Sequence, residues 1–468
     1  MEKVFVANRG EIATSIIRSA KKAGLKTKAL WVKGDPSFHR QIADELVITE
    51  SANVLLNAKA IVEAADGCNY LHPGYGFLGE SHLLYYEAKL RGITPFMPDE
   101  NVILFGLNKL LFWKELERQK LPVLPFFEKV VRSTTELKEA ANIVGFPLVL
   151  KSNIGCGGKA IAIVENEEQL YEKFLTVQRT STILFDSGDI VVQKFAKGDV
   201  ISVAVLSDGN DLFILPPTKS ILFRKFQKLA TSTEVSSSVA RKVEKLTRSI
   251  LANHRFKGIV EIEFIESEGE LYPIELNPRL PSDYHIINAA LQDDIVFWAI
   301  KAHLGEKVKI NTRKEKECVW FKVYAEDVLN NNQPVPDFIE KVVVPHFRNL
   351  RWYPSVTYPS KLPISFEALI GVAVAVEDTM EAAKDSAIQI LSEIIVTGVP
   401  TNKTLIKAAL MNKSLEEVIS EIEELEIYAA IGSALHDYFS INATKPINVS
   451  RTNWKDLNKF KAMFISRI

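Results

Sequence analysis

The chain is poor in the features that mark secreted, membrane-bound and nucleic-acid-binding proteins. Its 468 residues include three cysteines, Cys68, Cys156 and Cys318, whose scattered positions match neither a disulfide framework nor a zinc motif. No apolar signal core follows Met1, and the longest smooth apolar stretch, residues 368–376, is too short to span a bilayer. The formal net charge of -1 gives no excess of basic groups to attract nucleic acid. We therefore expect a cytoplasmic protein that binds neither membranes nor nucleic acids.

The length of the chain is sufficient for about three domains, each with its own hydrophobic core. Residues 3–32 have the pattern of a strand, a turn, an amphipathic helix that ends before Gly24, and a second strand. This βαβ unit lacks G-x-G-x-x-G, so the pattern does not favour dinucleotide binding. We expect an α/β protein with an N-terminal domain, a central domain that contains a mobile lid, a C-terminal α+β domain and a tail, at residues 1–105, 106–310 with the lid at 122–195, 311–430 and 431–468.

A glycine-rich segment, KSNIGCGGKA at residues 151–160, lies between two alternating β runs. A phosphate-binding loop of the Walker type leads from a strand into a helix, whereas this segment leads into a second strand. Its glycines, Gly155, Gly157 and Gly158, can still lay backbone N–H groups over phosphates because glycine lacks a Cβ, and Lys151 adds positive charge. The alternative is an ordinary flexible hairpin tip, and this segment alone does not decide between the two.

Acidic residues alternate along IVEIEFIESEGELYPIELN at residues 259–277. If the chain turns about Gly269, Glu263 lies opposite Glu275, and the preceding acid on the same face, Glu261, lies opposite Asn277. Two facing glutamates repel each other, and a divalent cation removes that repulsion. Carboxylate and amide oxygens are ligands that Mg²⁺ prefers, with phosphate oxygens completing its shell. The hairpin therefore favours a magnesium–nucleotide site, the alternative being a solvated sheet face with a different register.

Further motifs follow the order and spacing found in biotin carboxylases. Besides the two segments above, they are VANRGEIA, LHPGYGFLGES, VVQKF, FRKFQK, VYAED and VTGVPTN. On these motifs the chain resembles biotin carboxylase, an ATP-grasp enzyme, over residues 1–430. The resemblance implies an ATP-grasp fold with a Rossmann-like N-terminal domain. It also implies a ligase that uses ATP, Mg²⁺ or Mn²⁺, and bicarbonate to make carboxyphosphate and to carboxylate biotin on a separate carrier protein. Such a subunit is expected to form a homodimer and to work with a biotin carboxyl carrier protein and carboxyltransferase subunits.

The resemblance also implies roles for individual residues. Three positions match the metal ligands, namely Glu263, Glu275 and Asn277. Arg279 matches the arginine that holds bicarbonate and steadies the ureido oxygen of biotin, and Lys228 matches a lysine that reaches the transferred phosphate. Asp283 stands at the position of the general base. The residues that the resemblance assigns to ATP binding are Lys109, Lys151, Gly157, Gly158, Gln193, Lys194, Phe195 and Ala196.

The chain departs from the family pattern around bicarbonate and biotin. The family has a glutamate at the position of Asp283, so the carboxylate is kept but its reach is shorter by one methylene. Lys322 replaces an arginine of the biotin site and keeps the charge without the bidentate fork. The other changed positions are Phe223, Phe226, Pro281 and Ser282, together with Val200, where the family has a histidine that touches the nucleotide. The metal ligands and the lysines matched to the ATP phosphates are kept, so an ATP-using activity is expected.

Three functions are compatible with this pattern. The first is a biotin carboxylase subunit that acts on a separate carrier. The second is an ATP-grasp ligase that activates another carboxylate as an acylphosphate, and the third is an inactive, nucleotide-binding partner of a carboxylase complex. In the first two, closing of the lid at residues 122–195 is expected to exclude water from a reactive phosphate anhydride.

Overall fold

A computed structural model of the chain describes residues 1–420 except 156–157, 225–226, 331 and 364–365. The chain divides into two compact units, Met1–Lys413 and Ser414–Ile468. The described part of the second unit contains helical residues 415–420, and the predicted tail at 431–468 lies outside the described residues. No helix in the described part of the chain has the length and apolar character needed to cross a membrane.

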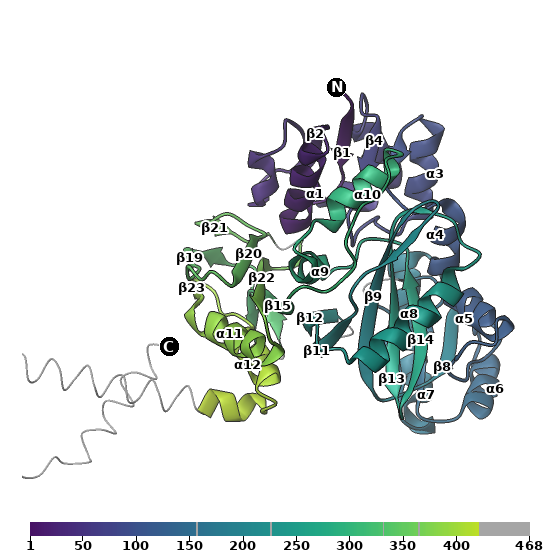
Figure 1. The fold of residues 1–468 in the computed structure, drawn as a ribbon. Coiled ribbons are helices and arrows are strands. Elements are labelled where there is room, and N and C mark those ends of the chain that lie inside the picture. Colours follow the sequence, from purple (N-terminus) through teal and green to yellow (C-terminus); the bar gives the residue numbers. More distant parts are fainter. Residues whose placement is uncertain (156–157, 225–226, 331, 364–365, 421–468) are drawn as a thin grey trace, which may run out of the picture. The chain divides into compact units, whose positions relative to one another are not determined.

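The N-terminal residues form a parallel five-stranded sheet with the order β3-β2-β1-β4-β5 (Figure 1). The strands are β1 (Lys3–Val6), β2 (Lys26–Val32), β3 (Glu45–Thr49), β4 (Tyr70–His72) and β5 (Thr94–Pro95). The helices are α1 (Gly10–Lys22), α2 (Ala58–Ala64) and α3 (His82–Leu90), with 3₁₀ turns η1 (Phe38–Gln41) and η2 (Ala52–Leu56). Helix α1 buries Ile12, Ile16 and Ile17 and is followed by Gly24 with a φ of +86°. The predicted βαβ unit is confirmed.

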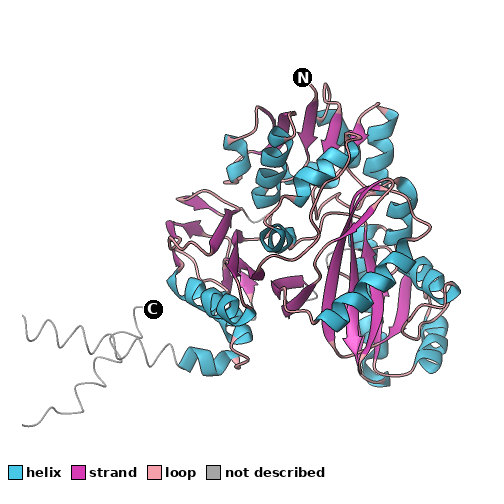
Figure 2. Ribbon diagram, in the orientation of Figure 1, coloured by secondary structure: helices cyan, strands magenta, loops and turns pink. Residues whose placement is uncertain are grey.

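A nine-stranded sheet follows, and all of its described strand pairs are antiparallel. Its order is β14-β13-β9-β11-β12-β15-β22-β20, with β10 paired to β9, and Figure 2 shows these strands in magenta. The bounds are β9 (Asp199–Asp208), β10 (Leu212–Ile214), β11 (Thr218–Arg224), β12 (Gln227–Ser232), β13 (Lys257–Ser267), β14 (Glu270–Asn277), β15 (Glu317–Tyr324), β20 (Leu350–Pro354) and β22 (Leu369–Glu377). The helices between these strands and before them are α4 (Glu100–Leu107), α5 (Lys109–Arg118), α8 (Ser237–Leu251), α9 (Tyr284–Leu291) and α10 (Ile295–His303).

A separate three-stranded sheet carries the glycine-rich segment. Its order is β7-β6-β8, with β6 (Leu148–Ser152), β7 (Ile161–Val164) and β8 (Ile190–Lys194). Helices α6 (Thr134–Val144) and α7 (Glu167–Phe185) enclose a hydrophobic cluster of their own with these strands. Strands β6 and β7 are antiparallel, so the glycine-rich segment leads from strand to strand as predicted. The cluster lies within the segment predicted as a lid.

Short strands and two helices complete the first unit. Three two-stranded sheets are formed by β16 (Glu326–Asp327) with β17 (Gln333–Pro334), β18 (Phe338–Ile339) with β21 (Ser360–Lys361), and β19 (Lys341–Val343) with β23 (Ile395–Thr397). The helices are α11 (Met380–Glu393) and α12 (Lys403–Leu410). Ala383, Ala387 and Ile390 of α11 pack in one buried cluster with β15 and β22.

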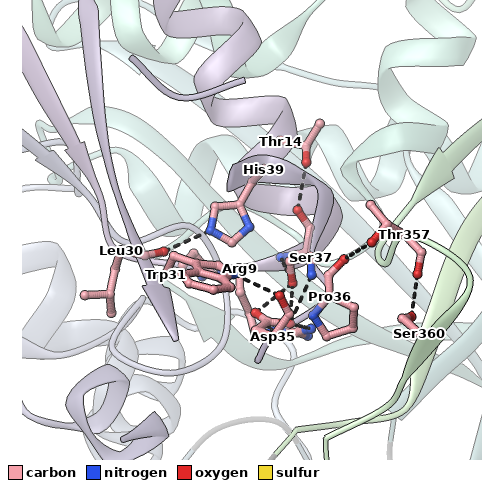
Figure 3. A network of polar contacts seen from close by, with 12 residues as sticks. Arg9, Thr14, Leu30, Trp31, Asp35, Pro36, Ser37, His39, Thr357 and Ser360 are labelled. Carbon is pink, nitrogen blue, oxygen red and sulfur yellow. Dashed lines mark hydrogen bonds and ion pairs between the residues drawn. The ribbon is translucent and has the colours of Figure 1, made fainter. Parts of the chain in front are cut away.

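The arginine of VANRGEIA belongs to a buried polar network that joins distant parts of the first unit (Figure 3). The Arg9 guanidinium donates to both oxygens of Asp35, from Nε at 2.8 Å and from Nη2 at 2.6 Å. Ser37 Oγ also donates to Asp35 at 2.8 Å. The backbone N–H and the hydroxyl of Thr357 both donate to the carbonyl of Pro36, at 2.8 and 2.9 Å. The loop after β2 is thereby tied to the segment between β20 and β21.

Candidate active site

The acid-bearing hairpin consists of β13 and β14, and it has the register predicted from the sequence. Glu263 faces Glu275, and Glu261 faces Asn277. Strand β13 also pairs with β9 from Lys257 to Glu266, so β13 is bonded to a strand on each side. The side chains of Glu263 and Glu275 are 16% and 18% exposed, so neither is fully solvated.

The hairpin reaches this register through a two-residue turn and a β-bulge, and not through a turn centred on Gly269. Glu268 and Gly269 form a two-residue turn with φ values of +53° and +80°, as in the hairpin turns that favour glycine at the second position. Ser267 therefore pairs with Glu270 next to the turn. A bulge after Glu263 shifts the pairing by one residue and produces the predicted register at the acidic end.

Glu261 lies buried between two cations near the end of the hairpin. Its Oε1 accepts a hydrogen bond from Lys228 Nζ at 2.5 Å, and its Oε2 accepts one from Arg279 Nη1 at 2.6 Å. The side-chain amide of Asn277 also donates to Oε2, at 3.2 Å. Burial alone would raise the pKa of Glu261, but the charges of Lys228 and Arg279 outweigh burial and lower the pKa to about 2.

The same contacts keep the two cations charged. Burial alone would lower the pKa of Lys228, but the negative charges of Asp283, Glu261 and Glu263 raise it above its usual range. Burial likewise opposes the charge of Arg279, and Glu261 and Glu80 outweigh it, so its pKa is also raised. Both cations are therefore protonated at neutral pH.

Arg279 connects the hairpin to the LHPGYGFLGES loop. Its Nε donates to Glu80 Oε1 at 3.0 Å, from a position 199 residues away in the sequence. Within the same loop, His72 Nδ1 accepts a hydrogen bond from the Gly74 N–H at 3.1 Å. Burial lowers the pKa of His72 to about 3, so the ring is neutral. Its hydrogen bond with Gly74 stabilises the turn that follows β4.

Lys109 joins the glycine-rich segment to the acidic hairpin. Its Nζ lies 2.9 Å from Glu275 Oε1 and donates to the Gly155 carbonyl at 2.7 Å. Lys109 is the first residue of α5, and its backbone N–H donates to the Asn153 carbonyl at 3.2 Å. The N-terminal end of α5, the glycine-rich segment and Glu275 therefore meet at one point, which places positive charge and backbone N–H groups together.

Lys151 lies on β6 beside β8. Its Nζ donates to Gln193 Oε1 at 3.4 Å and lies 5.5 Å from the ring centroid of Trp113. Burial lowers the pKa of Lys151 to about 8, although the charge of Glu275 opposes this shift. A bound phosphate would favour the charged form of this lysine, because opposite charge nearby offsets desolvation.

The segment predicted to frame adenine lies at the end of β8. Gln193 is buried and reaches Lys151, whereas Lys194 Nζ donates to the Phe146 carbonyl at 2.6 Å. The Phe195 N–H donates to the Pro147 carbonyl at 3.1 Å, and Ala196 follows directly. Gly158 lies in a turn with a φ of +67°, whereas Gly157 and Phe226 lie outside the described residues.

The facing carboxylates are suited to a cation. Burial, together with the charges of Glu261 and Glu275, raises the pKa of Glu263 to about 7, although Lys228 opposes the shift. Such a raised pKa means that a negative charge on Glu263 lacks sufficient compensation, which a divalent cation would supply. Within the described residues no cluster of three or more His, Cys, Asp or Glu side chains is arranged as a metal site. The carboxylates of Glu263 and Glu275 and the amide of Asn277 would therefore fill only part of the coordination shell of a metal ion and leave positions for phosphate oxygens.

Asp283 lies beside Lys228 and has one oxygen without a hydrogen-bond donor. Its side chain is 1% exposed, and its Oδ2 accepts a hydrogen bond from Thr218 Oγ1 at 3.2 Å. Lys228 Nζ lies 3.9 Å from the same oxygen. Among the described residues no group donates to the buried Oδ1. A buried carboxylate oxygen without a donor is unusual in proteins and is suited to accept a proton from a substrate.

Three family models match consecutive parts of the chain. They are "Biotin carboxylase, N-terminal domain" over residues 1–103, "Carbamoyl-phosphate synthase L chain, ATP binding domain" over 108–311 and "Biotin carboxylase C-terminal domain" over 321–425. The chain belongs to the biotin carboxylase family. The resemblance drawn from the motifs is thereby confirmed.

Two relatives in this family are similar to the chain over nearly their whole length. The biotin carboxylase of Haemophilus influenzae is 27% identical over 445 residues, which are 91% of this chain and 98% of that protein. The 2-oxoglutarate carboxylase small subunit of Hydrogenobacter thermophilus is 28% identical over 439 residues, 89% of this chain and 91% of that protein.

Solved structures confirm the ATP-grasp fold. The biotin carboxylase domain dimer of the Hydrogenobacter thermophilus 2-oxoglutarate carboxylase, in complex with MgADP, ADP and bicarbonate, has a TM-score of 0.84 at 27% identity and covers 89% of this chain and 95% of that chain. Biotin carboxylase from Campylobacter jejuni has a TM-score of 0.83 at 22% identity and covers 89% of this chain and 96% of that chain, and shows the same fold.

Beside the residues that the family resemblance assigns, the structure brings further groups to the site. The strand alternation places Glu261 on the same face as Glu263 but assigns it no function. Glu80 belongs to the LHPGYGFLGES motif, but the sequence gives no indication of its ion-pair partner. Ser202 accepts a hydrogen bond from Lys228 Nζ at 2.7 Å, and no sequence pattern singles it out. Lys322 lies with its Nζ 5.4 Å from the ring centroid of Tyr75, and burial lowers its pKa.

Proposed function

We propose that the chain uses MgATP and bicarbonate to carboxylate biotin on a separate carrier protein, with carboxyphosphate as the intermediate. The observation that supports this most is the convergence of Lys228, Arg279 and Asp283 at the end of the hairpin that carries Glu263 and Glu275. Two cations and a carboxylate with a free oxygen suit an anionic substrate that has to lose a proton. The relatives named biotin carboxylase and 2-oxoglutarate carboxylase small subunit support this activity.

The nucleotide is proposed to lie between the glycine-rich segment and the acidic hairpin. Lys109 and Lys151 bind its phosphates, the segment that contains Gly157 and Gly158 covers them, and residues 193–196 frame the adenine ring. Mg²⁺ held by Glu263, Glu275 and Asn277 would offset the charge of the phosphate oxygens during transfer. Both lysines are already buried, so each interaction with phosphate takes place where water screens charge little.

In the first step Asp283 accepts the proton of bicarbonate at Oδ1. A bicarbonate oxygen forms a bond to the γ-phosphorus of ATP while the bond from that phosphorus to the bridging oxygen of ADP breaks, and Lys228 stabilises the transferred group. Carboxyphosphate then splits into CO₂ and phosphate. Biotin N1′ attacks the CO₂ and its proton passes to phosphate, while Arg279 stabilises the negative charge on the ureido oxygen.

The wider assembly is part of the same proposal. Residues 122–195 contain a hydrophobic cluster separate from the large sheet, and we propose that they close as a lid over the nucleotide. The domain limits at 105, 310 and 430 stay predictions. The Hydrogenobacter thermophilus structure is a dimer, and we propose a cytoplasmic homodimer that serves a biotin carboxyl carrier protein and carboxyltransferase subunits.

The test is ADP formation by the purified chain with MgATP, measured with and without bicarbonate and free biotin, and with a panel of small carboxylic acids in place of bicarbonate. The proposal expects turnover that requires bicarbonate and increases with biotin. Turnover with another acid and not with bicarbonate would instead indicate an acylphosphate-forming ligase. Nucleotide binding without turnover on any acid would indicate an inactive partner subunit.

A further inference from the structure

The buried carboxylate of Glu261 has the contacts expected of a bound anion. Its two oxygens are shared between Lys228 Nζ and Arg279 Nη1, at 2.5 and 2.6 Å, with Asn277 as an additional donor at 3.2 Å. Glu261 is 1% exposed, so these contacts are made in a region with little water. A carboxylate and bicarbonate share a planar group with two equivalent oxygens and one negative charge.

These contacts conflict with free access of bicarbonate. Both cations that the proposed reaction needs for its anionic substrate already have a charged partner at hydrogen-bond distance. Arg279 has a second acidic partner in Glu80 at 3.0 Å, and Lys228 lies 3.4 Å from Glu263. An incoming anion would therefore meet a cluster in which acidic groups already offset the positive charge, and such a cluster attracts an anion weakly.

We propose that Glu261 determines the access of the anionic substrate, because its carboxylate occupies the bicarbonate position between Lys228 and Arg279 and has to leave before bicarbonate binds. This inference rests on the proposed function, in which the two cations hold bicarbonate and the transferred phosphate. Glu261 does not react with the substrate. It acts through the two cations, so its removal should change the KM for bicarbonate more than kcat.

Two variants separate this role from a structural one. Glu261→Gln keeps the volume of the side chain and one acceptor oxygen but removes the charge that competes with bicarbonate. Glu261→Ala also removes the side chain and leaves space between the two cations. Glu270→Ala, at the exposed turn end of the same hairpin, is the matched control. The affinity for MgADP, measured by calorimetry, shows whether each variant has a folded nucleotide site.

The kinetic readout is the KM for bicarbonate in ADP formation. We expect Glu261→Gln to lower this KM about tenfold relative to wild type, which is the effect of about 1.4 kcal/mol of lost competition. The Glu270→Ala control should keep the wild-type KM. An unchanged or raised KM in Glu261→Gln, at normal MgADP affinity, would overturn the inference.

The binding readout does not need turnover. In Glu261→Ala, potassium bicarbonate or potassium formate should raise the Tm by ~5 °C over potassium chloride at equal ionic strength, at about 100-fold excess over Kd. Wild type should show no such difference.

If no variant forms ADP but this anion-specific gain in Tm is present, the inference about Glu261 stands and the proposed function fails. Absence of the gain in a folded Glu261→Ala also overturns the inference, as an unchanged KM in Glu261→Gln does. If Glu261→Ala does not fold, the KM of Glu261→Gln decides alone.

Discussion

Replacing Asp283 by asparagine removes the proposed proton acceptor with the least change of shape. The asparagine oxygen can still accept the hydrogen bond from Thr218 Oγ1, which is 3.2 Å in the native chain. Lys228 loses a charge 3.9 Å away, an interaction of about 4 kcal/mol at an effective dielectric constant of about 20. It keeps Glu261 at 2.5 Å, so it stays protonated and the change is confined to proton transfer.

General-base catalysis contributes about 10²- to 10⁴-fold to a rate, so the bicarbonate-dependent kcat of Asp283→Asn should fall by that factor. This corresponds to a barrier higher by about 3–5 kcal/mol. The assay is ADP formation at saturating bicarbonate, with MgADP affinity measured in parallel and expected to be unchanged. Asp211→Asn, at an exposed position, is the matched control. A variant with the wild-type kcat would show that Asp283 does not accept the proton.

Three further predictions follow from the same geometry. Lys151→Met keeps the apolar stem of a buried side chain but removes its charge, so calorimetry should show MgATP affinity reduced about 10- to 100-fold; unchanged affinity would remove Lys151 from the phosphate site. Glu275→Gln removes one of the two facing charges, so the Mg²⁺ concentration for half-maximal activity should rise about 10-fold or more. If the variant had the same Mg²⁺ dependence as wild type, Glu275 would not be a metal ligand together with Glu263. Burial lowers the pKa of both His72 and His303 to about 3, so between pH 6.5 and 3 the unfolded chain binds more protons than the folded chain and stability falls as pH falls. In His303→Gln the slope of unfolding free energy against pH should decrease by about 1.4 kcal/mol per pH unit in this window, measured by denaturant unfolding, and an unchanged slope would refute a neutral His303 in the folded state.

The sequence was sufficient for the parts of the site that depend on local patterns. Strand alternation places Glu263 and Glu275 on facing positions, and the register that follows is the observed one. The bulge after Glu263 could not be read from the sequence, because the two-residue turn and the bulge shift the pairing in compensating directions. The predicted register was therefore right, although the turn is centred between Glu268 and Gly269 and not on Gly269.

Contacts between distant segments could not be predicted in this way. The ion pair of Arg279 with Glu80 joins positions 199 residues apart, and alternation within one strand gives no information on it. The ion pairs of Glu261 were missed because the alternation gave its cross-strand neighbour, Asn277, but not the lysine on β12 that reaches it. The partner of Lys109 is likewise a product of tertiary packing, since the N-terminal end of α5 meets the hairpin only in the fold.

The most direct test of the account is the fate of a bicarbonate oxygen. In the proposed step a bicarbonate oxygen forms the bond to the γ-phosphorus and stays with phosphorus when carboxyphosphate loses CO₂. With bicarbonate labelled with ¹⁸O, mass spectrometry of the released phosphate should show one labelled oxygen per turnover. Phosphate whose new oxygen comes from water would mean that the chain hydrolyses ATP without forming carboxyphosphate, and would contradict the proposed reaction.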